Sequence, residues 1–154
     1  MRRVRPALIG GALLAVAAAA TPARACTISA PGVAFGAYDP RAAGADDSSG
    51  TIGLACPTAS TTVIIALSTG SSGTYTTRTL KNGATNLNYN LYRDSTRTQI
   101  WGNGTAGTVT QTLSPGTLGG GTRNYTTTVY GRIPALQNVR AGAYGDTITV
   151  TVTF

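Results

Sequence analysis

The last eight residues, Thr147–Phe154, read TITVTVTF. Ile148, Val150, Val152 and Phe154 alternate with threonines, and successive side chains of a strand point to opposite faces of its sheet. The segment therefore predicts a β-strand with one face in the core and the other in water. Its apolar edge either pairs with a neighbouring strand of the same chain or stays open to a strand from another protein.

Similar short runs recur upstream, with turn signals such as Asn82-Gly83 between them. The run Thr61–Leu67 is apolar enough, through its residues 63–66, to predict a central strand covered on both faces. No window shows a clear 3.6-residue apolar period, so we expect no substantial helix and an all-β sandwich of two sheets. The expected strands are 26–30, 33–35, 51–56, 61–68, 75–80, 87–93, 99–101, 108–113, 124–132 and 147–154.

The beginning of the sequence has the pattern of a secretory signal peptide. A basic start, MRRVRP, leads into an apolar stretch from Ala7 to Ala20 and then into Ala23-Arg24-Ala25, which fits a cleavage site. We expect residues 1–25 to be a cleaved signal peptide and residues 26–154 to form one domain. No later segment approaches the roughly 20 apolar residues of a membrane-spanning helix, so no membrane span is expected.

Loss of the leader changes the charge of the protein. Four arginines leave with residues 1–25, so residues 26–154 carry eight basic and five acidic side chains. The remaining arginines are scattered and form no basic stripe with interleaved aromatic residues, so nucleic-acid binding is not expected. Abundant Thr, Gly, Ser and Asn are typical of an exported all-β protein.

The two cysteines, Cys26 and Cys56, both lie beyond the expected leader. In an oxidising compartment we expect them to form a disulfide. Closing a loop of about 30 residues would stabilise the fold by about 3–4 kcal/mol in the chain-entropy model. Two cysteines without histidine disfavour a metal site or a Cys–His nucleophile, and no metal or cofactor is expected.

Residues suited to catalysis are scarce. The chain has no histidine, and Asp39, Asp46 and Asp47 read as turn or loop residues because they precede Pro40 or a Ser-Ser-Gly run. We therefore expect no catalytic residue and no enzymatic activity. Trp101 could stack on a sugar, but we favour the interpretation that it packs at the margin of the core.

Three long segments resemble a known family. They are FGAYDP at 35–40, LNYNLYRDSTRTQIWGNGT at 87–105, and YGRIPALQNVRAGAYGDTITVTVTF at 130–154. They resemble the spore coat protein U domain family in the same order, and the resemblance covers nearly all of residues 26–154, including both cysteines. That family looks like the pilins of archaic chaperone-usher systems.

The resemblance implies a fold and a mode of assembly. Such subunits have an immunoglobulin-like sandwich that lacks its final strand, and a strand from a chaperone or a neighbouring subunit completes it. Ile148, Val150, Val152 and Phe154 would then lie along the groove that receives this donor strand. The implied partners are a periplasmic pilus chaperone, an usher and neighbouring pilin subunits, and the protein would pass through the periplasm to the cell surface, pilus or extracellular space.

Two functions are compatible with this resemblance. A fimbrial subunit acting in adhesion or biofilm formation requires an apolar groove open to a partner's strand. A surface-coat, spore-coat or matrix protein that is not assembled into a pilus requires a closed sandwich, and a carbohydrate-binding module is a more distant alternative. A polymerising pilin carries a donor segment before its first cysteine, whereas Cys26 directly follows the expected cleavage point, which favours a terminal or tip-like subunit or a coat protein.

Overall fold

The computed structural model describes residues 26–57, 62–115, 117–119 and 121–154, and the expected signal peptide, residues 1–25, lies outside this part. Strands dominate the described residues, which contain one short 3-10 turn, η1 (Gly70–Ser72). The expectation of an all-β fold is confirmed. No helix within the described ranges has the length and apolar character needed to cross a membrane.

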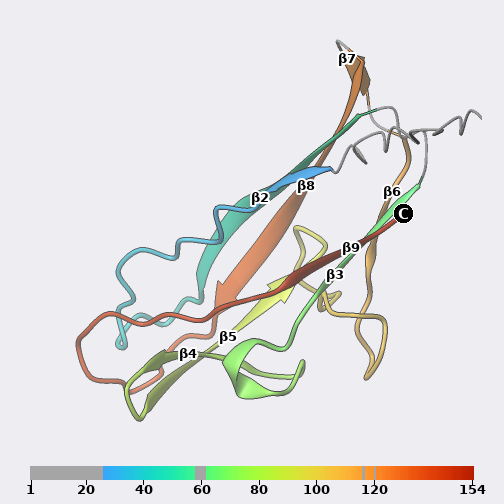
Figure 1. Cartoon of the computed structure of the whole chain (residues 1–154). Coiled ribbons are helices and arrows are strands. Elements are labelled where there is room, and N and C mark those ends of the chain that lie inside the picture. The colour runs from blue at the N-terminus through green and yellow to red at the C-terminus, as the bar shows by residue number, and fades with distance from the viewer. Residues whose placement is uncertain (1–25, 58–61, 116, 120) are drawn as a thin grey trace, which may run out of the picture.

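The strands form two sheets (Figure 1). The larger sheet has the order β1-β2-β8-β5-β4, with β7 attached to β8, and the smaller has the order β6-β3-β9. All named strand pairs are antiparallel. The strand bounds are β1 Thr27–Ser29, β2 Asp46–Pro57, β3 Val63–Leu67, β4 Arg78–Asn82, β5 Thr85–Tyr92, β6 Gln111–Leu113, β7 Thr117–Gly119, β8 Thr122–Ile133 and β9 Val150–Thr153.

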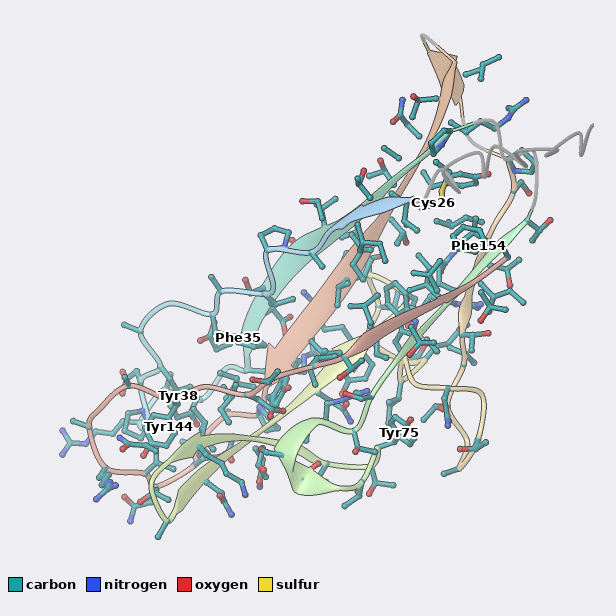
Figure 2. The ribbon with its side chains drawn as sticks, in the orientation of Figure 1. Cys26, Phe35, Tyr38, Tyr75, Tyr144 and Phe154 are labelled. Atoms are coloured by element: carbon teal, nitrogen blue, oxygen red, sulfur yellow. A yellow bond between two sulfur atoms is a disulfide. The ribbon has the colours of Figure 1, made fainter. Side chains whose placement is uncertain are left out.

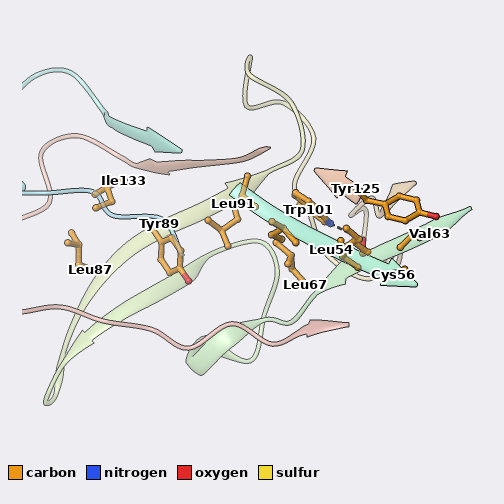
Figure 3. Packing of buried hydrophobic residues seen from close by; sticks show 13 residues of the cluster. Leu54, Cys56, Val63, Leu67, Leu87, Tyr89, Leu91, Trp101, Tyr125 and Ile133 are labelled. Atoms are coloured by element: carbon orange, nitrogen blue, oxygen red, sulfur yellow. Dashed lines mark hydrogen bonds between the residues drawn. The ribbon is translucent and has the colours of Figure 1, made fainter. Parts of the chain in front are cut away.

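The core lies between these sheets (Figure 3). Strands β2 and β8 pair along their whole length, and alternate residues of each turn inward because side chains of a strand alternate between faces. Burying each large aliphatic side chain contributes about 1.5–3 kcal/mol. The buried apolar residues are Ile52, Leu54, Cys56, Val63, Ile65, Leu67, Leu87, Tyr89, Leu91, Trp101, Tyr125, Val129 and Ile133.

Trp101 is fully buried, deeper than the core margin that we expected. Its indole Nε1–H donates a hydrogen bond to the Ile65 carbonyl at 3.0 Å, which satisfies the one polar group of the side chain. The ring therefore belongs to the core and is not placed to stack on a sugar.

Arg78, in β4, is also completely buried and joins the two sheets. Its guanidinium donates to the Ser68 carbonyl just after β3, to the Trp101 carbonyl, and to Asn90 Oδ1 in β5. Burial lowers the pKa of this guanidinium, and these hydrogen bonds compensate for the water that it loses.

The disulfide expected between Cys26 and Cys56 is present. It links the residue before β1 to the end of β2, next to the first β1–β2 pair, Thr27 and Ala55. The short strand β1 is thus held covalently at its N-terminal end.

Asp46 and Asp47 were wrongly expected to lie in a turn, because they are the first two residues of β2. Asp47 stands opposite Arg132 of β8, whose Nε and Nη2 donate to its two carboxylate oxygens at 2.7 and 2.8 Å. This bidentate pair, with Arg97 Nε 3.2 Å from Asp47, holds two turn-forming residues in a strand. The hydrogen bond from Arg132 also lowers the pKa of Asp47.

Three further expectations about strands were wrong. Residues 99–101 form no named strand, and Ile100 and Trp101 make only isolated bridges, to Tyr92 and Val109. Strand β3 is central in its sheet but is covered on one face only, since Ile64 is 41% exposed. Residues 33–35 are not part of a strand, although their side chains alternate inward and outward. Residues 33–35 instead belong to an extended segment, 30–36, that packs against β2 and β8 without joining a strand ladder.

Candidate functional site

Strand β9 has one open edge. Among the described strands it pairs only with β3, where Val150 faces Leu67 and Val152 faces Ile65. The neighbouring pair is hydrogen-bonded, because the Ser68 N–H donates to the Thr149 carbonyl at 3.0 Å. The Leu67 N–H instead donates away from β9, to the Gly102 carbonyl at 3.1 Å.

This pattern determines where the main chain of β9 points. In an antiparallel pair, facing residues alternate between hydrogen-bonded and non-hydrogen-bonded pairs. Since Ser68 and Thr149 are bonded, Val150 and Val152 belong to non-bonded pairs with β3. Their N–H and C=O groups therefore point toward the open edge, while their side chains are partly buried and those of Thr151 and Thr153 are exposed.

The extended segment 30–36 lies on the other side of this open edge, over the inner face of the large sheet. A side-chain carbon added at Gly50 of β2 would overlap the Gly32 carbonyl, and one added at Gly131 of β8 would lie 2.5 Å from the Phe35 ring. The Ser48 hydroxyl donates to the Ala34 carbonyl at 2.6 Å. The segment is thus anchored to β2 and β8 but has no ladder partner among the described strands.

A groove separates this segment from the chain leading into β9. Its first hollow, of about 420 Å³, lies between Val33 and Phe35 on one side and Ile148 and Val150 on the other. Its second hollow, of about 620 Å³, continues to Tyr144. The two hollows share Val33, Ala34, Phe35, Leu80 and Asp146 among their lining residues.

The groove runs along the molecule. Figure 2 shows Cys26 and Phe154 toward one end of the molecule and Tyr38 and Tyr144 toward the other. The floor is apolar and includes Ile52, Leu67 and Leu91, which belong to both sheets. Phe35 packs edge-on against Tyr89, with ring centroids 6.0 Å apart.

Asp146 is a polar element within this apolar groove. Its Oδ1 accepts hydrogen bonds from the N–H groups of Ser71 (2.9 Å) and Thr147 (2.8 Å), and its Oδ2 accepts one from the Tyr89 hydroxyl (2.7 Å). Burial and the hydrogen bond to Asp146 raise the pKa of Tyr89 well above its usual range. The carboxylate fits because Gly70 has no side chain, since a carbon there would overlap Oδ2.

Of the four residues expected to line the groove, two line it and two do not. Ile148 and Val150 line the first hollow. Val152 packs against the core cluster, and Phe154 is 57% exposed. The sequence interpretation missed Phe35, Tyr89 and Asp146, although the alternation that identified Ile148 continues upstream through Asp146 to Tyr144.

The acidic residues do not form a metal-binding cluster in the described part of the chain. No group of three or more His, Cys, Asp or Glu side chains there is arranged to hold a metal ion. Asp46, whose pKa is raised by burial and by Asp47, lies beside the ion pair of Asp47. The groove therefore offers shape, apolar surface and main-chain hydrogen bonds.

The model of the Spore Coat Protein U domain matches residues 12–151. The chain belongs to the Spore Coat Protein U domain family. Protein U of Myxococcus xanthus is a relative with 36% identity over 132 residues, which cover 78% of this chain and 70% of that protein. Membership of this family, whose pilus subunits are exported, implies an exported protein.

Solved structures add a likeness in fold. This protein matches one chain in a crystal structure of the CsuC-CsuE chaperone-tip adhesion subunit pre-assembly complex. That complex comes from the archaic chaperone-usher Csu pili of Acinetobacter baumannii. The TM-score is 0.60 at 24% identity, over 84% of this chain and 39% of that chain. The likeness supports the immunoglobulin-like pilin fold.

Proposed function

We propose that this protein is a structural subunit of a chaperone-usher pilus and that a strand from another protein completes its sandwich. The observation that carries the proposal is the vacant strand position between β9 and segment 30–36. A strand laid there would bond to the outward main-chain groups of Val150 and Val152, and its alternate side chains would enter the apolar groove.

The energetics favour occupation of this position. An uncovered strand edge invites pairing with other chains, and the groove exposes apolar surface that a donor strand would remove from water. The segment 30–36 already lies extended on the far side, so one strand can pair with both walls. The same vacancy explains why residues 33–35 have an extended chain and no ladder.

The proposal extends to the route of assembly. The leader 1–25 would direct export, residues 26–154 would fold in the periplasm, and a periplasmic chaperone would supply the first strand. An usher and a neighbouring pilin subunit would then replace it, and the assembled subunit would act at the cell surface in adhesion or biofilm formation. The fold likeness to the Csu complex and the family membership support this route.

A second candidate is a coat or matrix protein that functions without pilus assembly. The 36% identity to Protein U of Myxococcus xanthus favours it. Such a protein needs a sandwich that is stable alone, which separates the two candidates experimentally.

The test is expression of the full chain in a bacterial periplasm, with and without a candidate pilus chaperone of the archaic class. We expect a one-to-one complex with the chaperone and little folded monomer without it. Ile148→Glu places a charge in the groove and should lower the yield of complex by about tenfold or more. Thr149→Glu, on the neighbouring exposed residue, is the matched control and should leave the yield unchanged.

A different result would favour the coat or matrix protein. In that case the chain alone is a folded, stable monomer that binds neither the chaperone nor extended peptides. Equal yields from Ile148→Glu and Thr149→Glu would likewise show that the groove does not receive the strand.

A further inference from the structure

Two charged side chains line the groove: Asp146, which lines both hollows, and Arg140, which lines the second hollow and donates a hydrogen bond to the Asn82 carbonyl. Of the described residues that line the first hollow, Asp146 alone carries a charge, and it also lines the second hollow. It therefore lies between two apolar stretches, with Ile148 and Val150 on one side and Tyr144 on the other. A strand that fills the groove must pass over its carboxylate.

The present partners of Asp146 do not use its full hydrogen-bonding capacity. A carboxylate has about four acceptor positions. Three hydrogen bonds occupy Asp146, from Ser71, Thr147 and Tyr89. About one position is left for a further donor, and a strand in the groove can supply it because Asp146 lines both hollows.

No cation of the described chain neutralises this carboxylate by a salt bridge. The ion pairs among the described residues, with Arg97 and Arg132, both involve Asp47. The buried guanidinium of Arg78 is close enough to Asp146 for an electrostatic attraction, but its hydrogen bonds go to Ser68, Trp101 and Asn90. A strand that covers Asp146 with an apolar side chain would remove water from a charge without replacing its hydrogen bond, which is unfavourable.

We propose that Asp146 selects the strand that fills the groove: its inward side chains are apolar except for the one over Asp146, which is lysine or arginine. This inference rests on the proposed function of the groove as a strand acceptor. The apolar residues of the groove can bind any strand in which apolar and polar side chains alternate. A charge-assisted hydrogen bond to Asp146 would favour one sequence in one register.

The selection of register has a physical basis. A slip of two residues keeps the same side chains facing inward, so apolar contacts alone distinguish weakly between registers. Such a slip would move the lysine away from Asp146 and against Ile148 or toward Tyr144. The single charge thus converts a generally apolar groove into one with a defined alignment.

The test uses the full chain, purified after export with its disulfide intact, and fluorescent peptides of about nine residues, enough to span residues 144–152. The parent peptide alternates Thr and Val, and in each derivative one inward Val becomes Lys or Glu. We expect Lys at one position to tighten binding about tenfold or more over the parent, and Glu there to weaken it. Because residues 26–154 have a net positive charge, non-specific attraction would favour Glu instead.

The variant Asp146→Asn keeps the shape of the side chain and can still bond to Tyr89 and the two N–H groups. It should reduce the preference for Lys to less than about threefold. Asp39→Asn, an exposed residue outside both hollows, makes the same change in charge and should keep the full preference. If Asp146→Asn does not fold, the Glu peptides test on the unmodified protein whether the negative charge of Asp146 causes the preference for Lys.

The outcomes separate this inference from the proposed function. Binding of the parent peptide with no gain from Lys at any position, or with an unchanged gain in Asp146→Asn, overturns the role of Asp146 alone. Failure of every peptide, including the parent, refutes strand acceptance itself and the role of Asp146 with it.

Discussion

The wall of the groove formed by segment 30–36 depends on a missing side chain at Gly131. This residue lies in β8, opposite Leu91 of β5, and its place on the inner face is filled by Phe35. An added carbon would lie 2.5 Å from Phe35 Cζ and 2.9 Å from Val33 Cγ1. The substitution Gly131→Ala therefore tests whether this packing positions the wall.

The size of the effect follows from these distances. Ordinary carbon–carbon contacts are about 3.5–4.0 Å, so the Phe35 ring must move by about 1 Å. It cannot move freely because it packs on Tyr89. Overpacking of this kind costs about 1–3 kcal/mol of stability. A displaced ring also narrows the groove, and we expect the affinity for a Thr/Val peptide to fall by about tenfold, equivalent to about 1.4 kcal/mol.

The assay combines urea unfolding with fluorescence-polarisation binding of the peptide. Gly53→Ala in β2 is the matched control, because an added carbon there meets no atom within 4 Å. The double variant Gly131→Ala with Phe35→Leu should recover most of the binding by removing the ring that clashes. If Gly131→Ala matches Gly53→Ala in both stability and affinity, Phe35 does not fix the wall and the reasoning is refuted.

Two further predictions concern the polar side chains. Gly70→Ala should destabilise the protein by about 1–3 kcal/mol more than Gly73→Ala in urea unfolding, because both glycines have positive φ but only an added carbon at Gly70 overlaps Asp146. The lowered pKa of Asp47, caused first by its hydrogen bond from Arg132, contributes stability that is complete above the unfolded value of 3.8 and disappears as the pH falls through the lower folded value. Stability should therefore fall more steeply below pH 3.8 in the unmodified protein than in Asp47→Asn, and equal slopes would contradict this.

Local alternation was enough to predict the sandwich and the inward face of the last strand. Ile148 and Val150 reach the groove because a strand alternates its side chains whatever its neighbours are. The packing of Trp101 against the core also followed from its apolar character, but its complete burial did not. The sequence pattern could not reveal how many layers cover a strand, which is why Ile64 is exposed despite its apolar surroundings.

The errors arose where distant residues override local preference. Asp46 and Asp47 have turn-forming side chains, but Arg132, 85 residues away along the chain, holds Asp47 in β2. The groove itself depends on strand order, since an edge is open only if no other strand pairs with it. Asp146 was missed because the expected last strand began at Thr147, although its period-two relation to Ile148 was visible in the sequence.

The disulfide between Cys26 and Cys56 has a consequence for when the groove can form. It tethers the chain immediately before the wall segment 30–36, while Gly50 and Gly131 hold the middle of that segment by close packing. A reduced chain would lose the tether, and ordering the wall would then cost more conformational entropy. We therefore expect the groove to form only after the disulfide has formed. The protein would then become able to receive a strand only in an oxidising compartment.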